Sequence, residues 1–229
     1  TYAFDSRYLA EVNIGFNGTE QFAPSNRFGF FPAFSLGWVI SNESFMDNLR
    51  NNGIISNLKL RASVGKVGND GLGSTRFLYL DNIDLQYHTS HIPSLGNGGK
   101  IYERMVGNKN IHWEVAWKQN YAVDLTLFDD LDLTFDYFIE DRSDILIERN
   151  TVPAISGLTS SQLPRVNMGE IKNKGYEITL DYNTDITRDL NINFGGNFSY
   201  ARNKVISADE AVLSSDYAYR YRETGFSLG

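Results

Sequence analysis

Two histidines have a spacing that could serve metal chemistry. His88 and His91 stand three residues apart in the sequence HTSH, and neutral imidazoles can ligate zinc. A zinc site needs further ligands, but the chain has no cysteine and its only other histidine is His112. Acids nearby, such as Asp81 and Asp84, are of a kind found in any loop. We therefore expect no metal ion and no other cofactor.

Six carboxylates stand among the alternating residues of two long hairpins, and paired carboxylates can act as acid and base, as in glycoside hydrolysis. Their spacing follows from strand alternation, so the wet interior of a barrel explains them without catalysis. We expect the protein not to be an enzyme and these side chains to face a lumen. They are Asp124, Asp132, Asp136, Glu140, Glu177 and Asp181.

Aromatic residues in and beside a long irregular segment are better candidates for ligand contact. A flat ring with a polar edge can stack on a sugar or hold a peptide. The alternative is that these rings only pack the segment against the rest of the protein. Together with one neighbouring histidine, the candidate ligand-binding residues are Tyr79, Tyr87, His88, Tyr102 and Trp113.

Long strands must position these residues, most clearly in residues 112–148. Apolar and polar residues alternate along HWEVAWKQNYAVDLTLF and again, after FDD, along LDLTFDYFIE. A period of two indicates strands. Each runs to roughly 15 residues, about 50 Å, whereas a typical soluble strand has about five or six. Such long strands with one apolar face are typical of membrane barrels.

The same parity predicts the turns. Leu127 and Leu131 must share a face, which requires a three-residue turn from Phe128 to Asp130. Likewise, a three-residue turn, Thr187 to Asp189, is expected between Ile186 and Leu190. Six apolar residues of these hairpins should face outward toward lipid: Tyr121, Val123, Leu125, Leu133, Phe135 and Ile178.

The whole chain is predicted to be all-β, with seven long antiparallel strands. Their expected ranges are 7–17, 27–41, 56–65, the two strands of 112–148, 175–186 and 190–200. A short helix should follow the second strand, with Asn42 as N-cap and Gly53 as terminator. Segments without a sustained period should be loops, namely 66–110, 150–166 and 206–229.

The connections differ in length between the two ends of the strands. Long ones fall on one end and short ones mostly on the other, as in outer-membrane barrels with long extracellular loops and short periplasmic turns. The alternative is a soluble or surface-exposed β-rich binding module, such as an adhesin or carbohydrate-binding domain. What covers the apolar faces separates the two, because a soluble protein needs a second layer over them.

Composition excludes several classes of protein. Among 229 residues, 14% are aromatic and 41% hydrophobic, which argues against disorder. No run of 18 apolar residues occurs, so a transmembrane helix is not expected. A net charge of −7 without a basic stripe argues against a nucleic-acid partner. The chain opens with Thr1 almost directly in a strand pattern, which suggests a piece of a longer protein.

Four blocks carry a resemblance to a known family: RFGFFPAFSLGWVISNESFM, LKLRASVGKVGN, WEVAWKQNYAVDLTLFDDLDLTFDYFIEDRSDIL and GEIKNKGYEITLDY. Their order and spacing resemble the SusC/RagA-like TonB-dependent outer-membrane transporters of Bacteroidetes. The resemblance implies a 22-stranded transmembrane barrel closed around an N-terminal plug. It also implies import of large nutrients, such as oligosaccharides or oligopeptides, driven by the TonB complex.

The resemblance further implies a SusD-like surface lipoprotein as partner, outer-membrane lipid around the barrel, and a location in the cell outer membrane. Residues 1–229 would be an interior segment of the barrel, because the plug domain and the closing strands of the family pattern are absent from the sequence. Seven strands cannot close a barrel, so transport would be a property of the parent protein.

Overall fold

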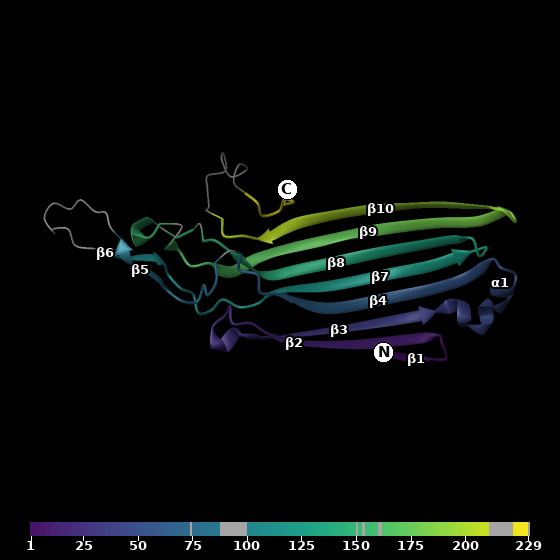
Figure 1. Ribbon diagram of the computed structural model, residues 1–229, viewed down its shortest axis with the longest axis horizontal. Helices are drawn as coiled ribbons and strands as arrows, with labels where there is room; N and C mark the ends of the chain where they lie inside the picture. Colours follow the sequence, from purple (N-terminus) through teal and green to yellow (C-terminus); the bar gives the residue numbers. More distant parts are fainter. Residues whose placement is uncertain are drawn as a thin grey trace.

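The computed structural model describes residues 1–73, 75–87, 100–149, 151–152, 154–159, 162–210 and 222–228. One antiparallel sheet holds eight strands in the order β1-β2-β3-β4-β7-β8-β9-β10, and β5 and β6 form a separate hairpin (Figure 1). The strands of the sheet are β1 (Tyr2–Phe4), β2 (Tyr8–Gly18), β3 (Phe28–Val39), β4 (Ile55–Asn69), β7 (Glu114–Leu127), β8 (Leu131–Ile147), β9 (Val166–Thr187) and β10 (Leu190–Ser207).

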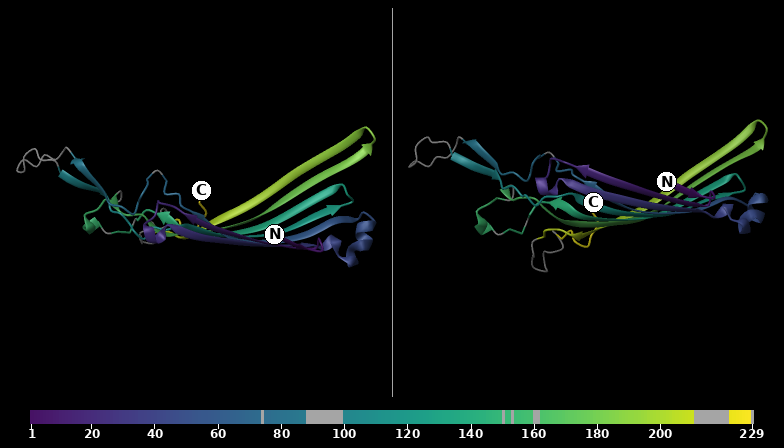
Figure 2. Two further views of the ribbon diagram at one scale, coloured as in Figure 1. Left: turned by 60° about the horizontal axis from the view of Figure 1, so that its bottom comes forward. Right: turned by 90° about the horizontal axis from the view of Figure 1, so that it is seen from below.

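The sheet is open and curved. Seen from the side, β9 and β10 rise out of the plane of the earlier strands (Figure 2). The β7–β8 and β9–β10 turns lie at the same end, which we call the turn end, and the opposite end is the loop end (Figure 1). The connections after β2, β4 and β8 lie at the loop end.

The central hairpin confirms the parity argument. Leu127 pairs with Leu131 across the three-residue turn, and the pairing continues without a break to Val115 and Ser143. Phe128 and Asp129 have φ values of 56° and 60°, the left-handed conformations that a tight hairpin turn uses. The alternating residues of both strands therefore fall on two opposite faces, one apolar and one polar.

The second hairpin corrects the predicted turn. Leu190 pairs with Thr187 rather than with Ile186, so the turn has two residues, Arg188 and Asp189. A register shift follows at once, because Asn191 pairs with Asp185 and Ile186 is left out as a bulge. The bulge restores the register that parity requires farther along the strands.

The strand number and lengths also differ from the prediction. The main sheet has eight strands rather than seven, because β1 adds a three-residue strand that is too short to show alternation. Segment 66–110 is not wholly loop. It contains the end of β4 and the hairpin of β5 (Asn82–Tyr87) and β6 (Lys100–Met105), whose irregular register shows no sustained period. β9 begins at Val166 rather than at residue 175.

The predicted short helix between β3 and β4 is present as α1 (Asp47–Asn51), but it begins later than predicted and two 3-10 turns, η2 (Ile40–Asn42) and η3 (Ser44–Met46), precede it. The turns η1 (Pro24–Asn26) and η4 (Ala154–Ser156) lie in loops. Asn42 is not the N-cap; Met46 precedes α1, and the Asn42 amide donates to the Ser6 carbonyl oxygen at 2.8 Å instead. Gly53 ends the segment as predicted, with φ 65° and its N–H donating to the Arg50 oxygen.

No second layer covers the apolar face in the part of the chain that the structure describes. Tyr121 and Phe135 are exposed, and the other predicted outward residues, Val123, Leu125, Leu133 and Ile178, are half-buried among neighbours on the same face. At the turn end, Glu43 between η2 and η3 accepts hydrogen bonds from Tyr8 and Trp38 of this face. No helix among the described residues is long and apolar enough to span a membrane.

The buried core lies at the loop end instead. Phe22, Leu72, Leu78 and Ile111 are its buried members, and Met105, Trp113 and Leu146 pack against them; we call this set the loop cluster. It joins the β2–β3 and β4–β7 connections to the end of β8. The loop cluster therefore holds together connections that are far apart in the sequence.

Candidate functional site: the polar face and the loop end

The six predicted carboxylates all lie on the polar face of the sheet. Asp124 and Asp136 belong to β7 and β8, and Glu177 on β9 pairs with Asp136. Asp132 lies directly opposite Asp181. Alternation places residues of one strand on the same face, and pairing of three adjacent strands brings the carboxylates of β7, β8 and β9 together.

Arg61 organises the centre of this face. Its Nε and Nη2 donate to the two carboxylate oxygens of Asp124 at 2.7 and 2.8 Å, and Nη2 lies 3.8 Å from Asp136. A guanidinium held by both nitrogens of its fork is fixed in direction as well as neutralised. Here β4, β7 and β8 are joined through side chains as well as through backbone bonds.

A second ion-pair group lies toward the loop end. Glu140 is 3.8 Å from both Lys118 and Arg142, and Arg142 is also 3.8 Å from Glu114. Glu114 accepts hydrogen bonds from the Asn69 amide at 2.8 Å and the Leu146 N–H at 3.0 Å. These hydrogen bonds and ion pairs connect β4, β7 and β8 to one another near the loop end.

Toward the turn end the polar face keeps a negative balance. Asp132 accepts a hydrogen bond from the Thr126 hydroxyl at 2.6 Å, and Glu177 accepts one from the Ser199 hydroxyl at 3.3 Å. Among the described residues no cation forms an ion pair with Asp132, Glu177 or Asp181. This part of the face can hold water or cationic and hydroxyl groups of a solute.

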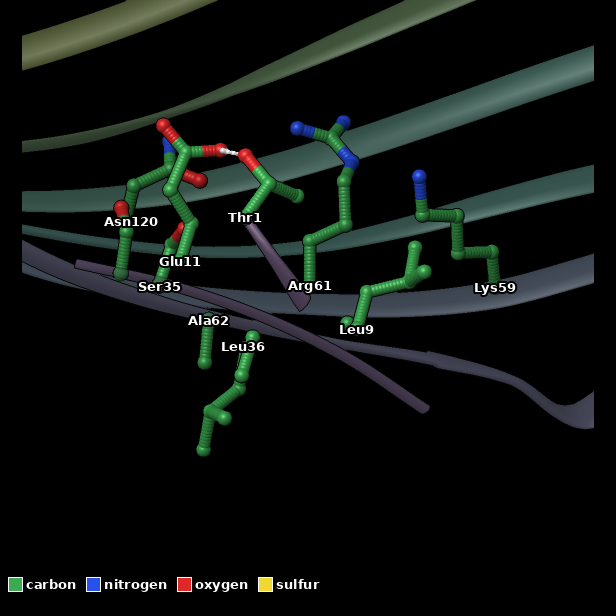
Figure 3. Close-up of a pocket in the computed structure, with 12 residues that line it drawn as sticks. Thr1, Leu9, Glu11, Ser35, Leu36, Lys59, Arg61, Ala62 and Asn120 are labelled. Atoms are coloured by element: carbon green, nitrogen blue, oxygen red, sulfur yellow. Dashed lines mark hydrogen bonds between the residues drawn. The ribbon is translucent and has the colours of Figure 1, made fainter. Parts of the chain in front are cut away.

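A hollow of about 320 Å³ opens in the polar face beside β1. Figure 3 shows Glu11, Arg61 and Asn120 on one side of the sheet and Leu36 and Ala62 on the other. Thr1 donates to Glu11 within the hollow at 3.2 Å. Its lining by both charged signs and hydroxyl groups resembles a wet surface more than a catalytic pocket.

The predicted aromatic candidates fall in different surroundings. His88 and the second histidine of HTSH lie outside the described residues. Tyr87 belongs to β5 and Tyr102 to β6, but their side chains are also outside the described part. Tyr79 is half-buried and meets the Phe77 ring edge-on at 6.3 Å. Whether these residues bind a ligand stays a prediction.

Trp113 is part of the loop cluster. Its ring meets Phe22 and Phe31 edge-on, with centroids 5.6 and 5.1 Å apart, and its Nε1 donates to the Arg27 carbonyl oxygen at 3.1 Å. Gly29 leaves the space that the Phe31 ring fills, because an added Cβ there would collide with the ring. Trp113 thus packs the loop end against the rest of the protein, which was the alternative to ligand contact.

The remaining histidine, His112, lies near Asp144, with 3.6 Å between Nε2 and the carboxylate. Within the residues described, no group of three or more potential metal ligands converges.

Glu43 is a buried carboxylate that sequence reasoning missed. It accepts hydrogen bonds from the Tyr8 hydroxyl at 2.7 Å, the Trp38 Nε1 at 3.1 Å and the Arg7 guanidinium at 3.3 Å. The hydrogen bonds from Tyr8 and Trp38 lower the pKa of Glu43. No local pattern could reveal it, since Tyr8 at the start of β2 and Arg7 just before it lie 35 and 36 residues away.

Comparison with known proteins decides the family. The model of the TonB dependent receptor-like, beta-barrel family matches residues 1–228. The chain belongs to this family. The TonB-dependent receptor P39 of Formosa agariphila is 32% identical over 91% of this chain, and the TonB-dependent receptor SusC of Bacteroides thetaiotaomicron is 25% identical over 89%.

Solved structures agree at the level of fold. The RagAB peptide importer in its closed-closed state superposes with a TM-score of 0.78 at 21% identity, over 97% of this chain and 23% of that one. The open-open state gives 0.75 at 22% identity, over 93% and 22%. The chain spans 19% of the length of P39 and 20% of the length of SusC.

Membership of the TonB-dependent receptor family confirms several expectations. The chain is an all-β, antiparallel segment of a TonB-dependent barrel, it is SusC-like, and it belongs to the outer membrane. The family consists of transporters and receptors rather than enzymes. The uncovered apolar face is consistent with this setting, because lipid replaces the second layer that a soluble sheet needs.

Proposed function

We propose that residues 1–229 form neighbouring strands of a 22-stranded barrel in an energised outer-membrane importer. The segment is interior to the barrel, and the plug domain and closing strands belong to other parts of the longer protein. One observation carries this proposal: the described sheet has an uncovered apolar face, a charged opposite face, and unpaired edges along β1 and along β10 as far as Val205, where the β10 backbone bonds to Gly225 and Phe226. Edges must be paired in lipid, which an eight-stranded open sheet cannot achieve alone.

The connection lengths support an orientation. The turn end has the β7–β8 and β9–β10 turns, whereas the loop end has the 70–113 and 148–165 connections. In barrels of this kind the long loops are extracellular and the turns periplasmic. We assign the loop end to the cell exterior, where the connections can meet a nutrient before it reaches the lumen.

The transported substrate is proposed to be a large nutrient, such as an oligosaccharide or oligopeptide, with energy delivered through TonB and a SusD-like surface lipoprotein as lid. Support comes from two neighbours: one relative is named SusC, and the superposed structures are of the RagAB peptide importer. The hydroxyl, amide and carboxylate groups of the polar face suit a hydrated, polar solute.

Ligand recognition is proposed to lie at the extracellular loop end. The residues assigned to it are Tyr79, Tyr87, His88 and Tyr102, while Trp113 packs in the loop cluster that supports them. Binding sites are commonly carried by loops on a rigid scaffold, and the loop cluster supplies such a scaffold beneath the β5–β6 hairpin. Each ring that stacks on the ligand should contribute about 1 kcal/mol, by analogy with aromatic pairs.

An exchange of segments between transporters tests this assignment. Residues 66–110 of the full-length transporter, together with residues 19–27 that pack against them, are grafted onto a relative that imports a different nutrient, and uptake of both nutrients is measured. The matched control grafts the turn-end segment 40–54, which lies at the other end of the same strands. Preference should follow 66–110 and ignore 40–54. If preference stays wholly with the recipient barrel, segment 66–110 does not select the nutrient and its aromatic residues only pack.

A further inference from the structure

Four cations gather on the apolar face at the loop end of the last two strands. Lys172 lies opposite Lys204 and Lys174 lies opposite Arg202 in the β9–β10 pairing. All four side chains are exposed. They share the face of Tyr176 because strand residues two apart point the same way. We call these four residues the basic patch.

Like charges placed directly across two strands repel each other, so the basic patch needs a source of negative charge. The structure supplies one: the Lys172 Nζ lies 3.0 Å from the Asp141 carboxylate. On β8 the residue opposite Lys174 is the apolar Ile139. Among the described residues, no acid forms an ion pair with Lys174, Arg202 or Lys204. Two cross-strand cation pairs are therefore balanced by a single acid.

The depth of the basic patch follows from the apolar run beneath it. On β9 the apolar face runs from Ile186, at the bulge, through Thr184, its one polar member, to Tyr176, ten residue steps, or about 33 Å along the strand. At a tilt near 40° this spans about 25 Å of membrane thickness, the height of the apolar band of such barrels. Tyr176 therefore marks the edge of the hydrocarbon that is nearer the loop end.

Aromatic rings confirm that edge. Tyr176 packs on Tyr200 and Phe198, with ring centroids 5.6 and 6.0 Å apart. Tyrosines gather at the level where hydrocarbon meets lipid headgroups. The basic patch begins two residues beyond Tyr176 and Tyr200, about 7 Å farther along the strands, and ends four residues beyond them, about 13 Å farther. Lipid headgroups occupy that depth.

The opposite rim of the same hairpins has the reverse charge. Acids outnumber cations around the two turns, with Asp129, Asp130, Asp185 and Asp189 against Arg188. In these two hairpins, therefore, clustered cations lie at the loop end and acids at the turn end.

We propose that the basic patch binds the phosphate groups of lipids in the leaflet at the loop end. Lipid phosphates are the anions present at that depth, and they carry the charge that the two cation pairs need. Arg202 offers a planar fork suited to a phosphate, while the lysines act as point charges around it. The proposal rests on the outer-membrane location and not on the imported nutrient, so uptake and lipid binding can fail independently.

The test uses the full-length transporter in a non-ionic detergent. It is titrated with phosphatidylglycerol or phosphatidylcholine, and bound lipid is counted by native mass spectrometry. The variant carries Lys174→Gln, Arg202→Gln and Lys204→Gln. The matched control removes the same charge elsewhere, through Lys59→Gln, Lys109→Gln and Lys118→Gln. A further variant, Lys174→Arg with Arg202→Lys and Lys204→Arg, keeps the charge and reports on folding.

The wild type, the control and the charge-conserving variant should bind phosphatidylglycerol more tightly than phosphatidylcholine. The glutamine variant should lose at least about tenfold in phosphatidylglycerol affinity, since each cation near an anionic lipid surface adds measurably to binding. Equal affinity of the glutamine variant and the wild type overturns the proposal. So does displacement of phosphatidylglycerol by millimolar inorganic phosphate, because the site would then serve a free anion.

Discussion

A row of leucines crosses the apolar face and offers a direct test of where the membrane lies. Leu58 pairs with Leu125, Leu125 with Leu133, and Leu133 with Leu180. On β9, Leu180 lies six residues from Ile186 and four from Tyr176, which are the two ends of the apolar run. The row therefore lies near the midplane of the bilayer. The perturbation is Leu125→Lys.

The expected cost of Leu125→Lys follows from its depth. A lysine facing lipid at the midplane of a barrel costs about 2–4 kcal/mol, and the cost falls to about 0–1 kcal/mol near the interfaces. Leu131→Lys tests the dependence on depth, because Leu131 is the first residue of β8 at the turn end. Thr134→Lys tests the dependence on face, because Thr134 lies on the polar face opposite Asp124. Its effect should stay within about 0.5 kcal/mol.

The assay is urea unfolding of the full-length transporter in phosphatidylcholine vesicles, with the three lysine variants compared at one lipid-to-protein ratio. The midpoint should fall most for Leu125→Lys, less for Leu131→Lys and least for Thr134→Lys. Equal midpoints for Leu125→Lys and the wild type would mean that this face does not meet hydrocarbon. Equal losses for Leu125→Lys and Thr134→Lys would refute the separation of the two faces.

Two further predictions concern charged groups. Arg61→Gln should lower the free energy of unfolding by about 0.5–1 kcal/mol, a figure discounted for the partial exposure of Arg61 and Asp124. The unfolding midpoint should recover in part when Asp124→Asn is added. No recovery would mean that the two residues are not coupled. The pKa of Glu43 is lowered in the folded protein, so its stabilising contribution is complete above the unfolded value of about 4.3 and disappears as pH falls through the lower folded value. The difference in unfolding midpoint between wild type and Glu43→Gln should therefore be constant from neutral pH to about pH 5 and shrink below about pH 4; a difference that grows on acidification contradicts the assignment.

The regular part of the fold could be predicted from sequence because it has a simple period. Alternation placed the strands of the central hairpin and the turn from Phe128 to Asp130, and it separated the apolar from the polar face. It could not predict that Ile186 forms a bulge, since a two-residue turn with a bulge and a three-residue turn give the same register beyond them. Alternation determines which face of the sheet each side chain occupies, but not the local path of the backbone.

The irregular parts depend on contacts between distant residues. Strand β9 runs nine residues farther than predicted because pairing with β8 and β10 stabilises VNMGEIKNK, a stretch without clean alternation. Glu43 is buried by Tyr8 and Trp38, which only the fold brings beside it. Trp113 shared the parity of an outward-facing strand, yet it precedes β7 and packs into the loop cluster.

The loop cluster limits how recognition can be moved between relatives. Phe22 from the β2–β3 connection packs with Leu78 and Ile111 from the β4–β7 connection. The Asn26 amide also donates to the carbonyl oxygens of Lys109 and Ile111 at 3.2 and 3.1 Å. Segment 66–110 grafted without residues 19–27 would meet a foreign partner in place of Phe22, which would leave a void or a clash in the buried core of the loop end. An exchange that keeps the shape of its loops should carry residues 19–27 together with 66–110.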